Sequence, residues 1–140
     1  MKKRSLPPLV GKVTNKDFDL SFRAHPTTGK LLMKKDDESV KQGLKNLLLT
    51  NRYERPFRPE FGGDVRKRLF DNFDTVFATD YENQIKTAIK NYEPRAVLSE
   101  TDSVIVTEAR DSNQLYITVR FRNASTLSDV AIDINLNKVR

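Results

Sequence analysis

The segment 115–136, LYITVRFRNASTLSDVAIDINL, has apolar residues at every second position on both sides of a polar break at 123–126. Alternation with a period of two is typical of a strand with one buried face, and a short polar break between two such runs predicts a hairpin. The preceding region 97–107 predicts one more strand, and the polar residues 111–113 predict the turn that joins it to the hairpin. We therefore expect a C-terminal antiparallel β-meander.

Upstream of the meander, the apolar spacing changes to the period of helices. The segment 37–50 carries an apolar stripe at i, i+4, i+7 and i+8, and the segment 64–70 predicts a short helix. A longer helix ends at 91–92; it begins either at Thr79, where Thr79–Glu82 has the form of a capping box, or one turn earlier at Thr75. A small group of three helices before a terminal sheet gives an α+β fold.

The N-terminus has the sequence of an extended arm followed by a short strand. Pro7-Pro8 forbids a helix there. In 17–22 polar and apolar residues alternate, which predicts a strand. The apolar face of this strand would carry Phe18, Leu20 and Phe22. We expect two parts: a basic extended arm at 1–16 and a single α+β domain at 17–140.

The net charge of +6 is concentrated near the N-terminus. Residues 1–35 contain nine Lys and Arg against two Asp, whereas residues 36–140 contain sixteen basic and seventeen acidic residues. The cations of the arm are Lys2, Lys3, Arg4, Lys12 and Lys16. Such an arm can bind nucleic acid or an acidic protein surface. We expect the acidic protein surface, because the rest of the chain is not basic.

Composition excludes several other classes of protein. There is no cysteine, so neither a disulfide framework nor a thiolate metal site can form. His25 is the only histidine and no Asp-x-Asp-x-Asp-Gly loop is present, so we expect no metal site and no cofactor. No apolar run approaches the roughly 18 residues of a membrane helix, and Ser5-Leu6-Pro7-Pro8 stands where a signal peptide needs apolar residues. We expect a soluble protein with no membrane partner.

The sequence offers no catalytic motif. It lacks a G-x-S-x-G elbow, a cysteine nucleophile and an H-E-x-x-H zinc site. Glu54 and Glu60 are a pair that a two-carboxylate glycoside hydrolase could use, but nothing in the sequence places them across a cleft or in apolar surroundings. We therefore expect no enzyme and no small-molecule substrate.

The tripeptide Glu93-Pro94-Arg95 lies where the last helix ends and the sheet begins. The proline restricts the backbone between two charged side chains, so both are projected with little freedom. An arginine held in this way can make a bidentate contact to a carboxylate of another protein, or the tripeptide can be an internal link at the helix end. The residues alone leave both interpretations open.

Five motifs in this order resemble the baseplate-wedge sheath-initiator family of contractile phage tails, which contractile bacteriocins and the type VI secretion baseplate share. They are 17–22 (DFDLSF), 44–50 (LKNLLLT), 55–62 (RPFRPEFG), 69–70 (LF) and 93–95 (EPR). The resemblance spans about residues 12–136. It implies the same fold as the periodicity does: a strand, a small helical group and a terminal antiparallel sheet.

By this resemblance the chain is a structural subunit of the tail baseplate in a virion, assembled in the host cytoplasm, and it initiates sheath assembly. Its partners would be other baseplate wedge proteins and the tail sheath protein, with the tail tube as a further candidate for the arm. The surface for the helical core bundle of the wedge would contain Glu93, Pro94, Arg95, Arg58, Pro59 and Glu60. The surface for β-strand addition by sheath subunits would contain Ala131, Ile132, Asp133, Ile134 and Asn135.

Two other functions remain as alternatives. Some members of the family are described as lysozymes, so a cell-wall-degrading hydrolase is one; a nucleic-acid-binding module that uses the basic arm is the other.

A free strand edge would bind incoming strands through main-chain hydrogen bonds. Outward charges would limit unwanted pairing of that edge; they are Arg120, Arg122, Asp129 and Asp133. The sequence does not indicate which edge of the sheet is open.

Overall fold

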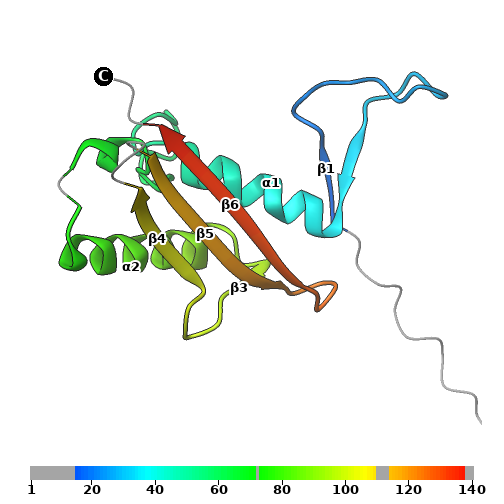
Figure 1. The fold of residues 1–140 in the computed structure, drawn as a ribbon. Coiled ribbons are helices and arrows are strands. Elements are labelled where there is room, and N and C mark those ends of the chain that lie inside the picture. Colours follow the sequence, from blue (N-terminus) through cyan, green and yellow to red (C-terminus); the bar gives the residue numbers. More distant parts are fainter. Residues whose placement is uncertain (1–14, 72, 110–113, 138–140) are drawn as a thin grey trace, which may run out of the picture.

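The alternating C-terminal segments form one antiparallel sheet in the computed structural model, which describes residues 15–71, 73–109 and 114–137. The strands of this sheet are β3 (Ala96–Val97), β4 (Val104–Ala109), β5 (Gln114–Asn123) and β6 (Asp129–Asn137). β5 is central: β6 pairs with one of its edges, and β4 and β3 pair one after the other along the opposite edge. The predicted meander is therefore confirmed in β4, β5 and β6 (Figure 1).

The single strand predicted over 97–107 is wrong, because the chain forms two strands there. Residues 98–103 leave the sheet between β3 and β4, and Asp102 turns this loop with a φ of +51°. Inside the loop the Ser99 hydroxyl donates to the carbonyl of Thr101 (2.8 Å). Local side-chain bonding of this kind competes with strand pairing.

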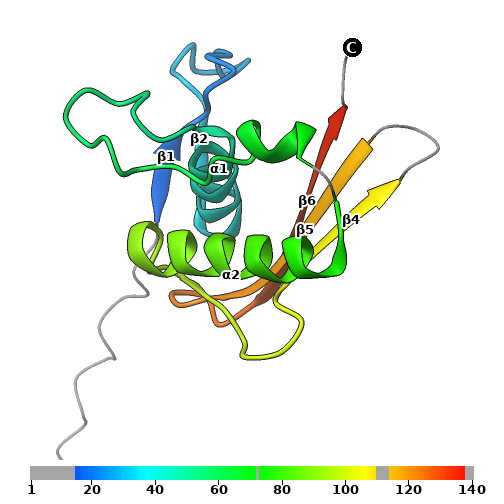
Figure 2. The ribbon, with the colours of Figure 1, turned by 90° about the vertical axis from the view of Figure 1, so that its left-hand side faces the viewer.

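Two α-helices, α1 (Asp36–Leu49) and α2 (Thr75–Tyr92), cover one face of the sheet (Figure 2). α2 begins at the earlier of its two predicted starts, because the carboxylate of Asp74 caps it by accepting from the amide of Phe77 (2.7 Å). Within the described residues, neither helix is long and apolar enough to cross a membrane.

The third predicted helix, expected over 64–70, is only the short 3-10 helix η1 (Lys67–Phe70), so two of the three predicted helices are α-helices. The predicted span began at Asp64, whose φ of +54° lies outside the region of right-handed helices. The Asp64 carbonyl accepts from the amides of Lys67 and Arg68 (3.1 and 3.4 Å), but the 3-10 turn itself begins only at Lys67. The buried side chains predicted for this segment, Val65 and Leu69, are nevertheless in the core.

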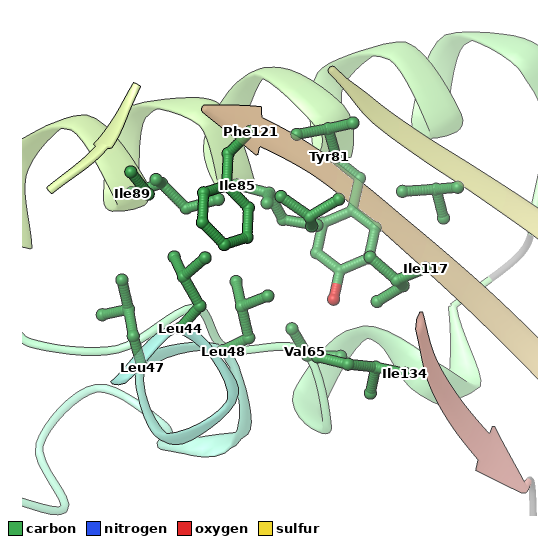
Figure 3. Close-up of a cluster of buried hydrophobic side chains, with 14 of the residues drawn as sticks. Leu44, Leu47, Leu48, Val65, Tyr81, Ile85, Ile89, Ile117, Phe121 and Ile134 are labelled. Carbon is green, nitrogen blue, oxygen red and sulfur yellow. The ribbon is translucent and has the colours of Figure 1, made fainter. Parts of the chain in front are cut away.

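The core fills the space between the two helices and the inner face of the sheet (Figure 3). Its fully buried members include Val40, Leu44, Leu47 and Leu48 of α1, Tyr81, Ile85 and Ile89 of α2, and Leu115, Ile117 and Val119 of β5. These side chains are the predicted helical stripes and the predicted apolar face of the alternating strand. Burial of apolar area is the main source of stability for such an arrangement.

A second, two-stranded sheet of β1 (Lys16–Phe18) and β2 (Met33–Lys35) stands away from the body (Figure 1). The strand predicted over 17–22 ends at Phe18, because the amide of Ser21 folds back onto the carboxylate of Asp19 (2.9 Å) and Phe22 has a φ of +51°. Lys16, which the sequence assigned to the arm, is the first residue of β1. The other arm cations lie outside the described residues; they are Lys2, Lys3, Arg4 and Lys12.

Candidate functional site

The outer edge of β4 is covered by α2. Main-chain groups of a strand alternate between its two neighbours, and the bond from the Arg120 amide to the Ser103 carbonyl (2.7 Å) sets this alternation in β4. The amide of Val106 therefore points away from β5, where it donates to the carboxylate of Glu82 on α2 (3.0 Å). Glu82 was predicted to close a capping box; instead it occupies a backbone donor on this sheet edge.

The outer edge of β6 has no such cover from a strand or helix in the part of the chain that the structure describes. The amide of Asn123 donates to the carbonyl of Ser128 (3.0 Å), so residues 130, 132, 134 and 136 are the ones that bond to β5. The amides of the residues between them point outward; these are Ala131, Asp133 and Asn135. The predicted segment 131–135 thus lies on the uncovered edge.

A groove of about 470 Å³ follows the uncovered edge of β6. One wall is formed by residues 131–134 of β6, and the others are the exposed side of α1 and the base of the β1–β2 hairpin. The lining side chains outside β6 include Lys34, Glu38, Lys41, Gln42, Lys45 and Leu20. A groove with a strand edge along one wall has the geometry that strand addition requires.

Polar side chains pair across β5 and β6 on the face of the sheet turned away from the helices. Arg122 and Asp129 lie opposite each other, with Nε and Oδ1 2.9 Å apart, and the hydrogen bond from Arg122 lowers the pKa of Asp129. Four residues further along each strand, the Thr118 hydroxyl donates to Asp133 (2.7 Å). Directly opposed pairs of this kind fix the register of β6 on β5. Their direct contribution to stability is small because water surrounds them.

The charged residues of the Glu93-Pro94-Arg95 corner bind each other. The Arg95 guanidinium donates two hydrogen bonds to the Glu93 carboxylate (2.6 and 2.8 Å) and one to the Ser39 hydroxyl of α1 (3.3 Å). Glu93 is only 7% exposed, and its hydrogen bonding raises the pKa of Arg95. Gly43 of α1 makes room for this pair, since a Cβ there would lie 2.5 Å from Glu93 Oε2. The corner therefore links α1 to the end of α2, and Pro94 remains exposed.

A second groove, also of about 470 Å³, opens beside Pro94 at the end of α2. Val97 and Leu98 line it with the proline, and Lys86 and Lys90 of α2 line its other side. Glu100 also lines it, so the groove combines apolar side chains with two cations and one carboxylate. An acidic helix with an apolar face has the matching chemistry.

The loop 51–63 brings Arg58, Pro59 and Glu60 toward the same end of α2. The Tyr92 hydroxyl, which precedes the corner by one residue, donates to the carbonyl of Glu60 (3.0 Å). The loop also closes on itself through the bond from the Tyr53 amide to the Pro59 carbonyl (2.7 Å). The structure therefore places the two predicted parts of this surface, 58–60 and 93–95, next to the same helix end.

Phe57 in this loop was not singled out from the sequence, yet it is 97% exposed. Arg55 and Arg58 flank it in the chain, and the Arg55 guanidinium lies 3.9 Å from the centre of the Phe61 ring. An exposed aromatic residue with neighbouring arginines is typical of the residues that dominate protein interfaces. The available signal was its place between Pro56 and Pro59, which exclude the helix or strand that could bury it.

Glu54 and Glu60 do not form a catalytic pair. Both are exposed, and Glu54 accepts hydrogen bonds from the main chain and side chain of Asn51 (3.0 and 2.7 Å). The general acid of a glycoside hydrolase needs apolar surroundings, which neither residue has. No cluster of three or more His, Asp or Glu side chains suited to a metal ion occurs among the described residues.

Comparison with known proteins assigns the chain to a family. Residues 34–127 match the family described as baseplate wedge protein gp25. The chain is 34% identical to baseplate wedge protein gp25 of Enterobacteria phage T4 over 92 residues, which are 66% of this chain and 67% of that protein. It is similar to a crystal structure from Geobacter sulfurreducens that carries the name tail lysozyme (TM-score 0.64, 27% identity, 74% of this chain and 92% of that one). It also shares the fold of a chain in the anti-feeding prophage baseplate (TM-score 0.60, 23% identity, 87% and 84% of the two chains).

Proposed function

The chain belongs to the gp25 baseplate wedge family and is a structural component of a contractile-tail baseplate, and on this premise we propose that it initiates assembly of the tail sheath. In this proposal, sheath subunits of the first ring each add a strand to the outer edge of β6. The observation that carries the proposal is the difference between the two sheet edges: α2 occupies a backbone donor of β4, whereas the outward amides of Ala131 and Asp133 face a groove.

Strand addition would use the backbone of this chain more than its side chains. The outward amides of Ala131, Asp133 and Asn135 would donate to carbonyls of the incoming strand, and their own carbonyls would accept. The cross-strand pairs of β5 and β6 would hold the edge in one register before the partner arrives. A pre-ordered edge lowers the entropic cost of binding.

A proline scan of β6 tests this function. In Ala131→Pro the outward amide is removed, and proline is tolerated on an edge strand. We expect this variant to fold and to enter baseplates, while sheath polymerisation on those baseplates falls at least tenfold. Ala131→Val keeps the amide and should support normal sheath assembly.

Ile132→Pro is the matched control for the fold, because the amide of Ile132 bonds to β5 instead of pointing outward. It should destabilise the chain, because the proline removes a hydrogen bond of the β5–β6 ladder. If Ala131→Pro baseplates still start sheaths at the normal rate, strand addition at this edge is wrong and a side-chain surface must bind the sheath.

We further propose that the loop 58–60 and the Glu93-Pro94-Arg95 corner dock on the helical bundle of neighbouring wedge proteins. The contacts inside the chain leave Pro94, its groove and Arg58 for the partner, since Glu93 and Arg95 bind each other. The test is the double variant Arg58→Glu, Lys90→Glu, with the exposed Lys67→Glu on η1 as control. We expect a folded chain that no longer joins wedges; a double variant that joins them as well as Lys67→Glu would overturn this proposal.

The name of the Geobacter relative supplies a hydrolase hypothesis, although no site in the described residues favours it. A muralytic assay of the purified chain should give no lysis above buffer.

For the basic arm we keep the proposal that it binds an acidic protein surface, with the tail tube as candidate. Deletion of residues 1–10 should weaken incorporation into tails and spare the fold, and salt-dependent DNA binding by the full chain would instead support a nucleic-acid role.

A further inference from the structure

The β1–β2 hairpin is amphipathic in the reverse of the usual sense. Asp17 lies on its inner face and accepts a hydrogen bond from the Ser39 hydroxyl of α1 (3.2 Å). Phe18 and Met33 are directly opposite each other and lie on the outer face, where they are 58% and 41% exposed. Strands next to a protein body normally bury their apolar face. Here the polar face meets the body and the apolar face meets solvent.

The outer face is apolar and basic together. Leu31, two residues before Met33, is 46% exposed and extends the apolar patch. By the alternation of the two strands, the opposed pair Lys16 and Lys35 lies on the same face as Phe18 and Met33. Neither lysine forms an ion pair with any residue that the structure describes. We call Phe18, Leu31, Met33, Lys16 and Lys35 the outer hairpin patch.

The acidic residues of the hairpin are not available to neutralise this patch. Asp17 is bonded to α1, and Asp19 accepts from the Ser21 amide (2.9 Å), which lowers its pKa. Both carboxylates are therefore already engaged within the chain and lie on the other face. The partner of the two free lysines must bring its own carboxylates.

The hairpin is also held in one orientation on the body. The Gln42 side chain of α1 donates to the carbonyl of Phe18 (2.7 Å), and the amide of Asp36 donates to the carbonyl of Asn15 (2.8 Å). The Asn15 side chain in turn donates to the Ser125 hydroxyl in the β5–β6 turn (2.8 Å). A patch fixed in this way loses little conformational freedom when it binds.

We propose that the outer hairpin patch docks on a neighbouring baseplate subunit through a surface with an apolar centre and carboxylates at its rim. The proposal rests on membership of the baseplate family but is independent of strand addition at β6. Exposed apolar patches rimmed by charge mark protein interfaces, and the free lysines select an acidic partner. The family match begins at Lys34, so most of the hairpin lies outside the residues that the family model matches.

The first test is incorporation into baseplates assembled with the other tail proteins of the same particle. Phe18→Ser and Met33→Ser together remove the apolar centre, and Val76→Ser is the control because Val76 is 78% exposed on α2. In competition with the unaltered chain, we expect the double variant to be incorporated at least tenfold less and the control to be incorporated equally. All three chains should give the same far-ultraviolet circular dichroism. Equal incorporation of the double variant would overturn the proposal.

The second test identifies the chemistry of the partner. A carbodiimide joins a lysine amine to a carboxylate that it touches, so it should link Lys16 or Lys35 in purified baseplates to Asp or Glu of another protein. If the carbodiimide links Lys16 or Lys35 only to other copies of this chain, or forms no link, the proposal is wrong. It is also wrong if the patch becomes accessible only when residues 1–14 are deleted. Failure of strand addition would leave both results unchanged, because Ala131→Pro chains still enter baseplates whereas hairpin variants are lost before that step.

Discussion

The β5–β6 hairpin and the β1–β2 hairpin are both built from alternating sequence, and they direct their apolar residues to opposite sides. In β5 the apolar residues Leu115, Ile117 and Val119 are buried against the helices, and the residues between them face solvent. In β1 and β2 it is Phe18 and Met33 that face solvent, while Asp17 meets α1. The same period therefore serves a core in one place and an exposed surface in the other.

The difference follows from what each strand has beside it. β5 is ten residues long, pairs on both edges and is covered by two helices, so burying its apolar side contributes more than any other orientation could. β1 has three residues and only α1 nearby, which presents Ser39 and Gln42 to it. Two polar side chains cannot cover a phenylalanine but can satisfy an aspartate and a carbonyl. Alternation thus predicts an amphipathic strand and leaves its orientation to the neighbours.

The largest expected difference between the two hairpins is in stability. Ile117→Ala, at a fully buried position, should lower the free energy of unfolding by about 2–5 kcal/mol. Phe18→Ala removes a larger side chain and should change it by less than about 0.5 kcal/mol, because that side chain is exposed. Urea unfolding of both variants measures this. A cost above about 2 kcal/mol for Phe18→Ala would show that the hairpin packs on the body, and the contrast would be lost.

The next difference in stability is expected between an ion pair in the packed body and one in the β1–β2 hairpin. Arg95→Met leaves the Glu93 carboxylate buried without its partner and should cost about 2–3 kcal/mol. Arg23→Met breaks the exposed contact of Arg23 with Asp19 (3.9 Å) and should leave the melting temperature unchanged. Thermal unfolding separates the two. Addition of Glu93→Gln to Arg95→Met should restore part of the loss; if it does not, packing and not charge explains the cost.

A smaller effect on stability is expected from the hydrogen bonds that attach each hairpin to α1. Asp37 accepts from Asn123, Thr126 and Ser128 in the β5–β6 turn, and these bonds lower its pKa. Its contribution is complete above the unfolded-state pKa of about 3.9 and is lost as the pH falls through the lower folded-state pKa. Asp37→Asn should cost about 1–2 kcal/mol at neutral pH, a value reduced by solvent screening. It should also flatten the acid limb of stability against pH.

Asp17 provides the matched control for this contribution to stability, because it attaches the β1–β2 hairpin to α1 through one longer hydrogen bond from Ser39 (3.2 Å). The free energy of unfolding of Asp17→Asn, measured at neutral pH, should stay close to that of the unaltered chain. If both variants lose the same amount at neutral pH, the two hairpins are fastened equally well. The comparison would then rest on burial alone.

The smallest effect on stability is expected from a buried polar group in the core that has no hydrogen-bond partner. The Tyr81 hydroxyl is buried and has no hydrogen-bond partner among the described residues, and burial raises its pKa. Tyr81→Phe removes this unsatisfied group and should leave stability unchanged or raise it by up to about 1 kcal/mol. Guanidinium unfolding with an unchanged m-value would support this. A clear loss of stability would mean that the hydroxyl has a partner, such as an ordered water.

Sequence periodicity was most informative about the core and least informative about the surfaces. The stripes around Leu44 and Ile85 and the alternation through Ile117 predicted buried residues, because these patterns are long enough to fix a face. From the sequence, Thr75 could be recognised as a possible start of α2 but could not be preferred. The reason is that Thr79–Glu82 also has the form of an N-terminal cap. Only the fold shows that Glu82 bonds to Val106 on β4. The segment 131–135 could be identified as a strand, but its place on the uncovered edge could not.

The amino-acid sequence alone determined the α+β class, the antiparallel meander, the family and the absence of cysteine, because composition, period and motifs are properties of the chain itself. Tertiary structure decided which sheet edge α2 covers, the internal pairing of Glu93 with Arg95 across from Gly43, and the outward direction of Phe18 and Met33. Each of these depends on what lies next to a residue in space. The energy of burying or exposing a side chain belongs to that neighbourhood, and no local pattern specifies it.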